Sequence, residues 1–237
     1  MRLLIITSLL FITNLSYAVV IQRDFDAFTI WMDCDARGAW VFYYETVPDT
    51  GSLPRLNSFY KDNEIADECQ VTTRATYPRP VDKYDRGHLV PQNHFDHDME
   101  LRRQTNIITN VLPQALSMNR GAWKRTENIT ECYRDQTTLQ ILGGVIWGDD
   151  ETNDHFVSTH GIATPDAYWK IIWSEDDLIA WIVPNAHDAL GNQLDSYIVS
   201  VGEIETRIQA NILVIPPELR NMRPSTSWQL PDGCNLQ

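Results

Sequence analysis

Four consecutive residues, Asp85-Arg86-Gly87-His88, combine side chains that could act together on a phosphate ester. His88 carries the side chain whose unperturbed pKa lies nearest neutrality, so it can take a proton from an attacking water molecule. The planar guanidinium of Arg86 suits phosphate oxygens, and Gly87 lets the backbone approach a ligand closely. These residue types favour a role in hydrolysis at phosphorus. A short motif with one histidine also fits an ordinary surface segment.

Two polar residues further along the chain, Asn119 and Glu127, could bind a divalent cation. The amide oxygen of Asn119 suits Mg²⁺, a hard ion that keeps most of its water ligands. Residues 122–133 have helix-forming character, so we expect Asn119 at or just before the first turn. A regular helix then places Glu127 within ~80° of Asn119 and about 12 Å along the axis. We therefore expect Glu127 to reach the ion through a bound water; a helix cap and a solvated glutamate are the plainer interpretation.

The order of these motifs narrows the interpretation. The segments are DRGH at 85–88, TN-x-x-PQ at 109–114, MNRGAW at 118–123 and the glutamate four residues after that tryptophan. This set resembles the DNA/RNA non-specific endonuclease family, which has a ββα-metal (His-Me finger) site. The similarity is dense from about Tyr84 to Cys132, continues more weakly to residues 199–205, and is only general over residues 19–70.

The resemblance implies a role for each matching residue. His88 corresponds to the general base, and Asn119 to the single direct protein ligand of Mg²⁺, with Mn²⁺ as an alternative ion. Glu127 corresponds to the residue that positions metal-bound water. Asn110 corresponds to a supporting asparagine and Arg86 to the arginine of the DRGH motif. The implied reaction is hydrolysis of DNA and RNA that leaves 5′-phosphate ends, because the metal stabilises the charge on the leaving 3′-oxygen.

Two features depart from the family pattern. Family members often have an arginine four residues after the glutamate, where this chain has Glu131, with Arg134 three residues further on. An arginine from an upstream strand also commonly contacts the scissile phosphate. Arg55 is the better candidate and Arg74 the other. By the same resemblance, Asp85 is expected to be structural and to hold the strand and its loop in place.

The elements expected to position these residues belong to an α+β domain with a mostly antiparallel central sheet flanked by helices. Aromatic and β-branched residues predict strands, and Ser200 with Glu203 has the form of a capping box before a helix over 204–210. The predicted strands are 39–45, 139–147, 168–173 and 178–183.

A histidine- and aspartate-containing segment and four tryptophans fit structural roles better than functional ones. The segment 93–98, which contains two histidines and two aspartates, could be a metal site but is interpreted as a solvated loop. Four tryptophans on the predicted strands are interpreted as packing residues rather than base-stacking ones. These are Trp147, Trp169, Trp173 and Trp181.

The ends of the chain suggest export. Residues 1–18 have a basic start, a short apolar run and the cleavage-type sequence Ser16-Tyr17-Ala18, which predicts a signal peptide and a single domain over 19–237. An uncleaved anchor is the alternative; otherwise we expect no membrane association and a secreted or periplasmic protein. Four cysteines favour two disulfides. Of three connectivities we favour the pairing of sequence neighbours, Cys34–Cys69 and Cys132–Cys234.

The charge distribution is uneven. The chain has a formal net charge of −13, yet residues 74–134 hold ten Lys/Arg against seven Asp/Glu, which gives +3 there and −16 elsewhere. A basic region on an acidic body fits local binding of an anionic substrate. It argues against a protein that coats DNA through many phosphate contacts. A solvated surface of mixed charge is the plainer interpretation.

Three functions remain to be distinguished. The favoured one is an endonuclease of low sequence preference, because phosphate and metal contacts carry no sequence information. The alternatives are a metal-dependent phosphodiesterase acting on small esters and a non-catalytic secreted nucleic-acid-binding protein. Binding alone needs neither a general base nor a metal ligand, which speaks against the last. The sequence leaves open whether the protein forms a homodimer.

Overall fold

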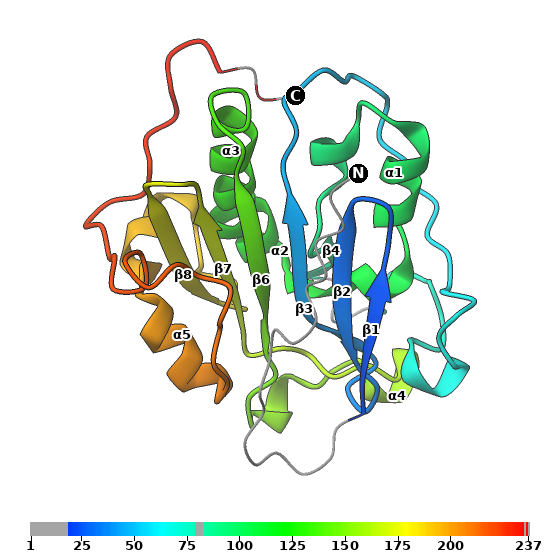
Figure 1. Cartoon of the computed structure of the whole chain (residues 1–237). Coiled ribbons are helices and arrows are strands. Elements are labelled where there is room, and N and C mark those ends of the chain that lie inside the picture. Colours follow the sequence, from blue (N-terminus) through cyan, green and yellow to red (C-terminus); the bar gives the residue numbers. More distant parts are fainter. Residues whose placement is uncertain (1–18, 79–82, 235, 237) are drawn as a thin grey trace.

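The computed structural model describes residues 19–78, 83–234 and 236, and its main feature is a six-stranded antiparallel sheet (Figure 1). The predicted signal peptide lies outside the described residues. The α+β class is confirmed, and all four predicted strands are present. In the order of the sheet, the strands are β1 (Val20–Asp24), β2 (Phe28–Asp33), β3 (Gly38–Glu45), β6 (Gln140–Ile146), β7 (Ala167–Trp173) and β8 (Leu178–Pro184).

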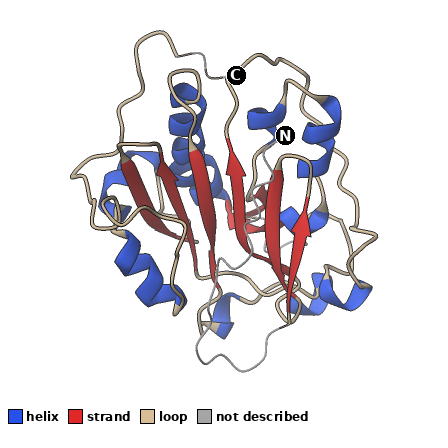
Figure 2. Cartoon of the chain, in the orientation of Figure 1, coloured by secondary structure: helices blue, strands red, loops and turns tan. Residues whose placement is uncertain are grey.

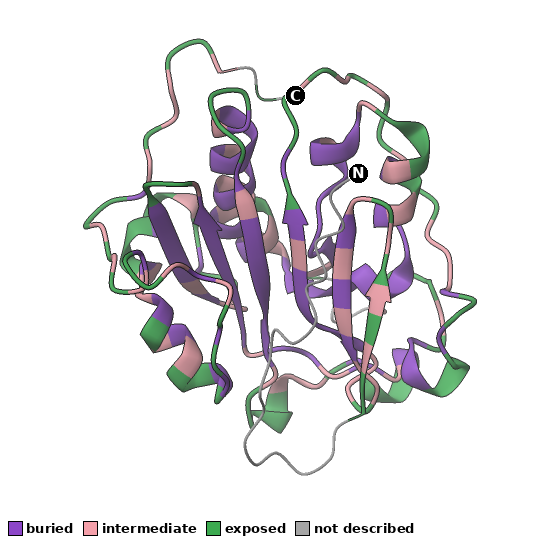
Figure 3. Cartoon of the chain, viewed as in Figure 1, coloured by how far each residue is buried: buried purple, intermediate pink, exposed green. Residues whose placement is uncertain are grey.

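Burial changes across this sheet. All seven residues of β7 are buried, so both of its faces are covered and its sequence is nearly continuous in apolar residues. In contrast, β2 alternates buried and half-buried residues, and β1 at the edge is largely exposed (Figure 3). Trp169, Trp173 and Trp181 are buried and Trp147 is partly buried. These four side chains therefore pack in or against the core, as predicted.

A separate two-stranded sheet carries the DRGH motif (Figure 2). Strand β4 (Tyr84–His88) pairs with β5 (Val111–Ala115), and His88 lies opposite Val111. The amide of the buried Gln114 crosses the backbone at Gly87, where any side chain would collide with it, so the close approach requires glycine. Strand β5 leads directly into the helix that carries the metal-site candidates.

That helix is continuous but not regular. It starts as α2 (Leu116–Met118), passes through a π-helical turn (Asn119–Trp123) and continues as α3 (Lys124–Tyr133). The helix predicted over 122–133 is thus present. The angle of ~80° expected between Asn119 and Glu127 holds only for a regular α-helix. A π turn changes the angle between these two side chains around the helix axis. Such turns frequently occur at functional sites.

The connection between β4 and β5 corrects the expectation of a solvated loop at 93–98. Gln92–Phe95 forms a 3₁₀ turn in which His94 and Phe95 are buried, and Asp96 is buried after it. His94 Nδ1 lies 2.8 Å from the hydroxyl of Tyr44 on β3. The segment is therefore held against the large sheet. It continues into α1 (Met99–Thr105) and into a 3₁₀ turn at Ile108–Asn110.

The remaining helices lie around the sheet. Helix α5 (Val201–Ile208) starts with the predicted capping box, in which Ser200 Oγ accepts from the amide of Glu203 at 3.3 Å and the Glu203 carboxylate accepts from the amide of Ser200 at 2.8 Å. Helix α4 spans Val157–His160. Short 3₁₀ turns occur at Asp67–Cys69, Glu151–Asn153 and Gly191–Tyr197.

Two disulfides close long loops. Cys34 pairs with Cys69 and Cys132 with Cys234, which confirms the predicted connectivity. The second bridge ties the last turn of α3 to the C-terminal segment. Within the described part of the chain, no helix is both long and apolar enough to cross a bilayer.

Candidate active site

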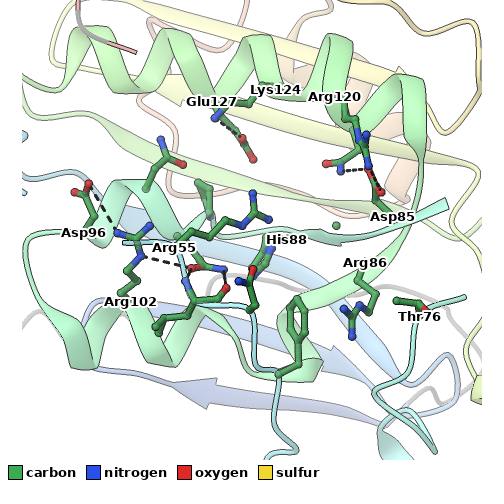
Figure 4. A pocket seen from close by; sticks show the side chains of 18 of the residues that line it. Arg55, Thr76, Asp85, Arg86, His88, Asp96, Arg102, Arg120, Lys124 and Glu127 are labelled. Atoms are coloured by element: carbon green, nitrogen blue, oxygen red, sulfur yellow. Dashed lines mark hydrogen bonds and ion pairs between the residues drawn. The ribbon is translucent and has the colours of Figure 1, made fainter. Parts of the chain in front are cut away.

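A pocket of about 850 Å³ opens between β4, the α2–α3 helix and the segments around residues 55 and 92 (Figure 4). Four of the five predicted site residues line it: Arg86, His88, Asn119 and Glu127. They come from three elements, the strand β4, the π turn and α3. The strand–strand–helix arrangement thus brings together residues up to 41 positions apart in the sequence. The fifth, Asn110, is not part of the lining.

The orientation of His88 is set by Asn106, a residue that the sequence motifs did not identify. Its amide nitrogen donates to the carbonyl oxygens of Leu56 (3.3 Å) and Ser58 (3.1 Å), so its oxygen must face His88. That oxygen lies 2.8 Å from His88 Nε2. Because an amide oxygen only accepts, Nε2 carries the proton and Nδ1 keeps a free lone pair. The ring thus has one nitrogen, Nδ1, that can accept a proton.

Burial keeps this imidazole neutral. Desolvation is the largest effect and lowers the pKa of His88 to about 4; the Asn106 contact raises it, and the nearby charges of Arg55 and Arg86 lower it further. The ring also packs against Phe59, with centroids 5.5 Å apart. At neutral pH the side chain is therefore in its proton-accepting form.

Asp85, which was expected to be structural, holds Asn119 and Arg120 of the neighbouring helical turn. Its carboxylate accepts from Asn119 Nδ2 at 2.8 Å and from two nitrogens of Arg120 at 2.9 Å each (Figure 4). Burial raises the pKa of Asp85, but these hydrogen bonds outweigh it, and the pKa lies below its ordinary value. With the amide nitrogen occupied, Asn119 Oδ1 is the atom left for a ligand.

Glu127 lies on the same helix, and its side chain is largely buried. Lys124 Nζ is 3.4 Å from one of its carboxylate oxygens. In the described part of the chain, no group of three or more His, Cys, Asp or Glu side chains could enclose a metal ion. The donor set nevertheless fits a hydrated hard cation, because Asn119 offers one fixed neutral oxygen and Glu127 one carboxylate on the same wall.

The structure separates the two candidate arginines. Arg55 lines the pocket and its charge acts on both His88 and Asp85. Arg74 is not part of the lining; it donates to the carbonyl of Phe59 at 2.8 Å, and its own carbonyl accepts from Arg86 at 2.5 Å. Of the two candidates, only Arg55 therefore lies in the pocket lining. Arg74 supports Arg86 from behind.

Asn110 and Glu131 both face away from the pocket. Asn110 is fully buried; its oxygen accepts from Val90 N (3.0 Å) and its nitrogen donates to the carbonyls of Val90 (2.9 Å) and Thr105 (2.8 Å). It closes the loop after His88 and lies outside the pocket lining, which suits the supporting role that the resemblance implies. Glu131 is buried against Arg134 at 2.7 Å.

The sequence of this chain is similar to those of known nucleases. A model of the DNA/RNA non-specific endonucleases matches residues 11–219. The mitochondrial nuclease EXOG of Danio rerio is 25% identical over 171 residues, which cover 65% of this chain and 48% of that protein. A nuclease of Serratia marcescens is 24% identical over 208 residues, covering 82% and 76%. Human mitochondrial endonuclease G is 20% identical over 206 residues, covering 81% and 68%.

The chain spans about half the length of the EXOG proteins it matches. The family match nonetheless covers most of the chain, including the whole strand–strand–helix unit that lines the pocket. The chain therefore belongs to the DNA/RNA non-specific endonuclease family.

Proposed function

We propose that this protein is a metal-dependent endonuclease that hydrolyses phosphodiester bonds in DNA and RNA. One observation carries the proposal: a neutral imidazole of fixed tautomer and an asparagine whose amide nitrogen is held by Asp85 line the same arginine-rich pocket. The family match and the printed names of the relatives support the reaction class. A site for binding alone would need neither group.

In this proposal His88 Nδ1 takes a proton from water as that water attacks phosphorus. Asn119, held by Asp85, would bind Mg²⁺ or Mn²⁺, and Glu127 would hold a water molecule beside it. When bound, the metal supplies positive charge to the phosphate and to the leaving oxygen. Arg55 and Arg86 orient the phosphate between these groups. Departure of the 3′-oxygen leaves a 5′-phosphate.

Low sequence preference follows from the nature of the lining. The charged groups of the pocket suit phosphate oxygens, which are the same in every nucleotide and carry no sequence information. Both DNA and RNA are therefore proposed as substrates. Small phosphate diesters are the alternative, and they would need no contact outside the pocket.

We also propose that the mature protein is one domain over 19–237 in an oxidising compartment, the periplasm or the medium. Two disulfides without a free cysteine among the described residues support such a compartment, as does the leader-like composition of residues 1–18. Two relatives have names that place them in mitochondria, so fractionation of cells expressing the full chain is the direct test.

The activity is tested by incubating purified protein with plasmid, single-stranded DNA, RNA and a small diester, with Mg²⁺, Mn²⁺ or EDTA. We expect cleavage of all three nucleic acids that EDTA abolishes. Loss of a general base lowers rates by about 10²–10⁴-fold, so His88→Ala should lose that much. The exposed His155 provides the matched control, because His155→Ala removes an imidazole outside the pocket. Undiminished digestion by His88→Ala would contradict the mechanism.

A further inference from the structure

Lys124 is a basic residue of the pocket for which the proposed mechanism gives no role. It is the first residue of α3, lines the pocket and has 40% of its side chain exposed. In Figure 4 it lies on the same helix as Glu127, above the pocket, and a dashed line marks their ion pair. The ammonium is 3.4 Å from the carboxylate, a distance longer than an ordinary charge-assisted hydrogen bond. The pair is therefore loosely made.

Three other pocket cations have tighter partners. Arg120 binds the Asp85 carboxylate through two nitrogens. Arg102 donates to the carbonyl of Leu53 and has Asp96 nearby. Arg86 donates to a backbone carbonyl and stacks its guanidinium 4.4 Å from the Phe59 ring centroid. Among these four cations, Lys124 has the most freedom to move to a new acceptor.

The next turn of α3 offers no basic group to the pocket. Glu131 turns inward, where it accepts from Asn93 at 3.0 Å and pairs with Arg134 at 2.7 Å. Arg134 itself is fully buried. Of the residues of α3, only Lys124 and Glu127 are part of the lining. Positive charge on this wall of the pocket, within the described residues, therefore comes from Lys124 and the already paired Arg120.

We propose that Lys124 is a phosphate-binding residue whose resting partner is Glu127. A lysine ammonium is a point charge on a flexible stem, so it can leave a carboxylate for a phosphate oxygen with little rearrangement. Its departure frees the carboxylate of Glu127 when nucleic acid occupies the pocket. This inference rests on the proposed function, since it assumes a nucleic-acid substrate.

The test measures binding, not cleavage. A fluorescent DNA duplex is titrated with His88→Ala protein in EDTA over a range of salt concentrations, with and without Lys124→Gln. Each phosphate contact contributes about 0.9 to the slope of log K against log salt. We expect Lys124→Gln to reduce the slope by about one and to weaken binding several-fold at low salt. Lys124→Arg should restore the slope.

Arg125 gives the matched control. Arg125 is not part of the pocket lining, yet Arg125→Gln removes the same charge from the adjacent position of α3. An unchanged slope in Lys124→Gln, an equal reduction in Arg125→Gln, or no DNA binding by the parent protein would each overturn the inference. Failure of the proposed function would give a different result. The His88→Ala protein would bind DNA with the predicted slopes, but the wild-type protein would cleave nothing with Mg²⁺ or Mn²⁺. That result would support the phosphate contact of Lys124 and contradict the proposed catalysis.

Discussion

At the scale of single residues, the chemistry of His88 depends on burial more than on a charged partner. No carboxylate is among the groups that shift its pKa; desolvation lowers that pKa to about 4. We therefore expect the acid limb of kcat/KM to lie well below the ordinary histidine value of 6.5, so that activity at pH 6 stays close to activity at pH 7.5. Plasmid nicking rates measured across pH 4–8, with circular dichroism to verify folding, check this. A limb centred at 6.5 or above would contradict it.

Asn106 should control which nitrogen of His88 is protonated. Replacing it with alanine removes the acceptor that holds the Nε2 proton. Loss of a comparable contact to a metal-binding histidine typically costs about 10–100-fold in activity. We expect Asn106→Ala to lower kcat by that factor. Nitrogen-15 shifts of the histidine ring should show the Nε2–H form in the wild-type protein and a mixture in the variant. A single unchanged tautomer in Asn106→Ala would exclude this role.

Sequence motifs predicted His88, Asn119 and Glu127 but not Asn106, and the reason is physical. A motif is visible when its residues are close in sequence, whereas Asn106 meets His88 from 18 positions away across a folded loop. Arg55 was the better candidate, but Arg74 stayed open for the same reason, because only the fold decides which guanidinium lines the pocket.

At the scale of elements, β7 and α3 meet through a buried charge. Lys170 is the one basic residue of the fully buried β7; it donates to Thr126 Oγ1 at 2.8 Å and lies 3.9 Å from the Trp123 ring centroid. Trp123 in turn donates to the carbonyl of His88 at 3.3 Å. The large sheet thus contacts the helix at Thr126, one residue before Glu127. Through Trp123 it also contacts the strand that carries His88.

This arrangement predicts a pH-dependent stability. Burial lowers the pKa of Lys170 from 10.5 to about 8, and the Glu127 carboxylate partly offsets that effect. Between pH 8 and pH 10.5 the unfolded chain binds more protons than the folded protein, so the free energy of unfolding rises with pH in this range. Below pH 8 the full cost of burying the charged lysine is present. A shift of this size corresponds to about 3 kcal/mol.

Lys170→Met removes the titrating group while keeping much of its length. The unfolding free energy of the variant, relative to the wild type, should therefore fall by up to about 3 kcal/mol from pH 7.5 to pH 10.5. Urea unfolding at several pH values measures the difference, in which the other lysines and tyrosines cancel. If the free energies of unfolding of the two proteins changed with pH in the same way, the Lys170 ammonium would not be desolvated in the folded protein.

The predictable elements were those with strong local patterns. Runs of apolar and aromatic residues identified β3, β6, β7 and β8, and a capping box identified the start of α5. Helix α1 has the polar sequence MELRRQT, with no apolar stripe to mark it, and depends on the Asp98 cap and on packing. The π turn at Asn119–Trp123 has no sequence signal of this kind. Its geometry becomes visible only when the helix is placed against β4.

At the scale of the whole molecule, charge is segregated toward the pocket. Arg86, Arg102, Arg120 and Lys124 come from the basic segment 74–134, and only Arg55 comes from outside it. The rest of the chain carries the negative charge. An acidic body with one basic pocket would repel nucleic acid except where the reacting groups lie, which favours release of product over tight retention.

The two disulfides should differ in their contribution to stability because they close loops of different length. Cys34 and Cys69 are 35 residues apart, and Cys132 and Cys234 are 102 apart. In the chain-entropy account the longer loop stabilises the fold by about 1 kcal/mol more than the shorter one. The pair Cys132→Ala with Cys234→Ala should therefore lose more unfolding free energy than Cys34→Ala with Cys69→Ala.

The longer bridge also fixes α3, since Cys132 is in its last turn, five residues after Glu127. We expect its removal to lower both the urea midpoint and the cleavage rate, whereas removal of Cys34–Cys69, which joins segments before β4, should act mainly on stability. Unfolding by urea and initial rates on plasmid, both under non-reducing conditions, compare the two double variants. Equal losses of stability, or a larger loss on removing the shorter loop, would mean that native packing around Cys34 and Cys69 outweighs loop entropy.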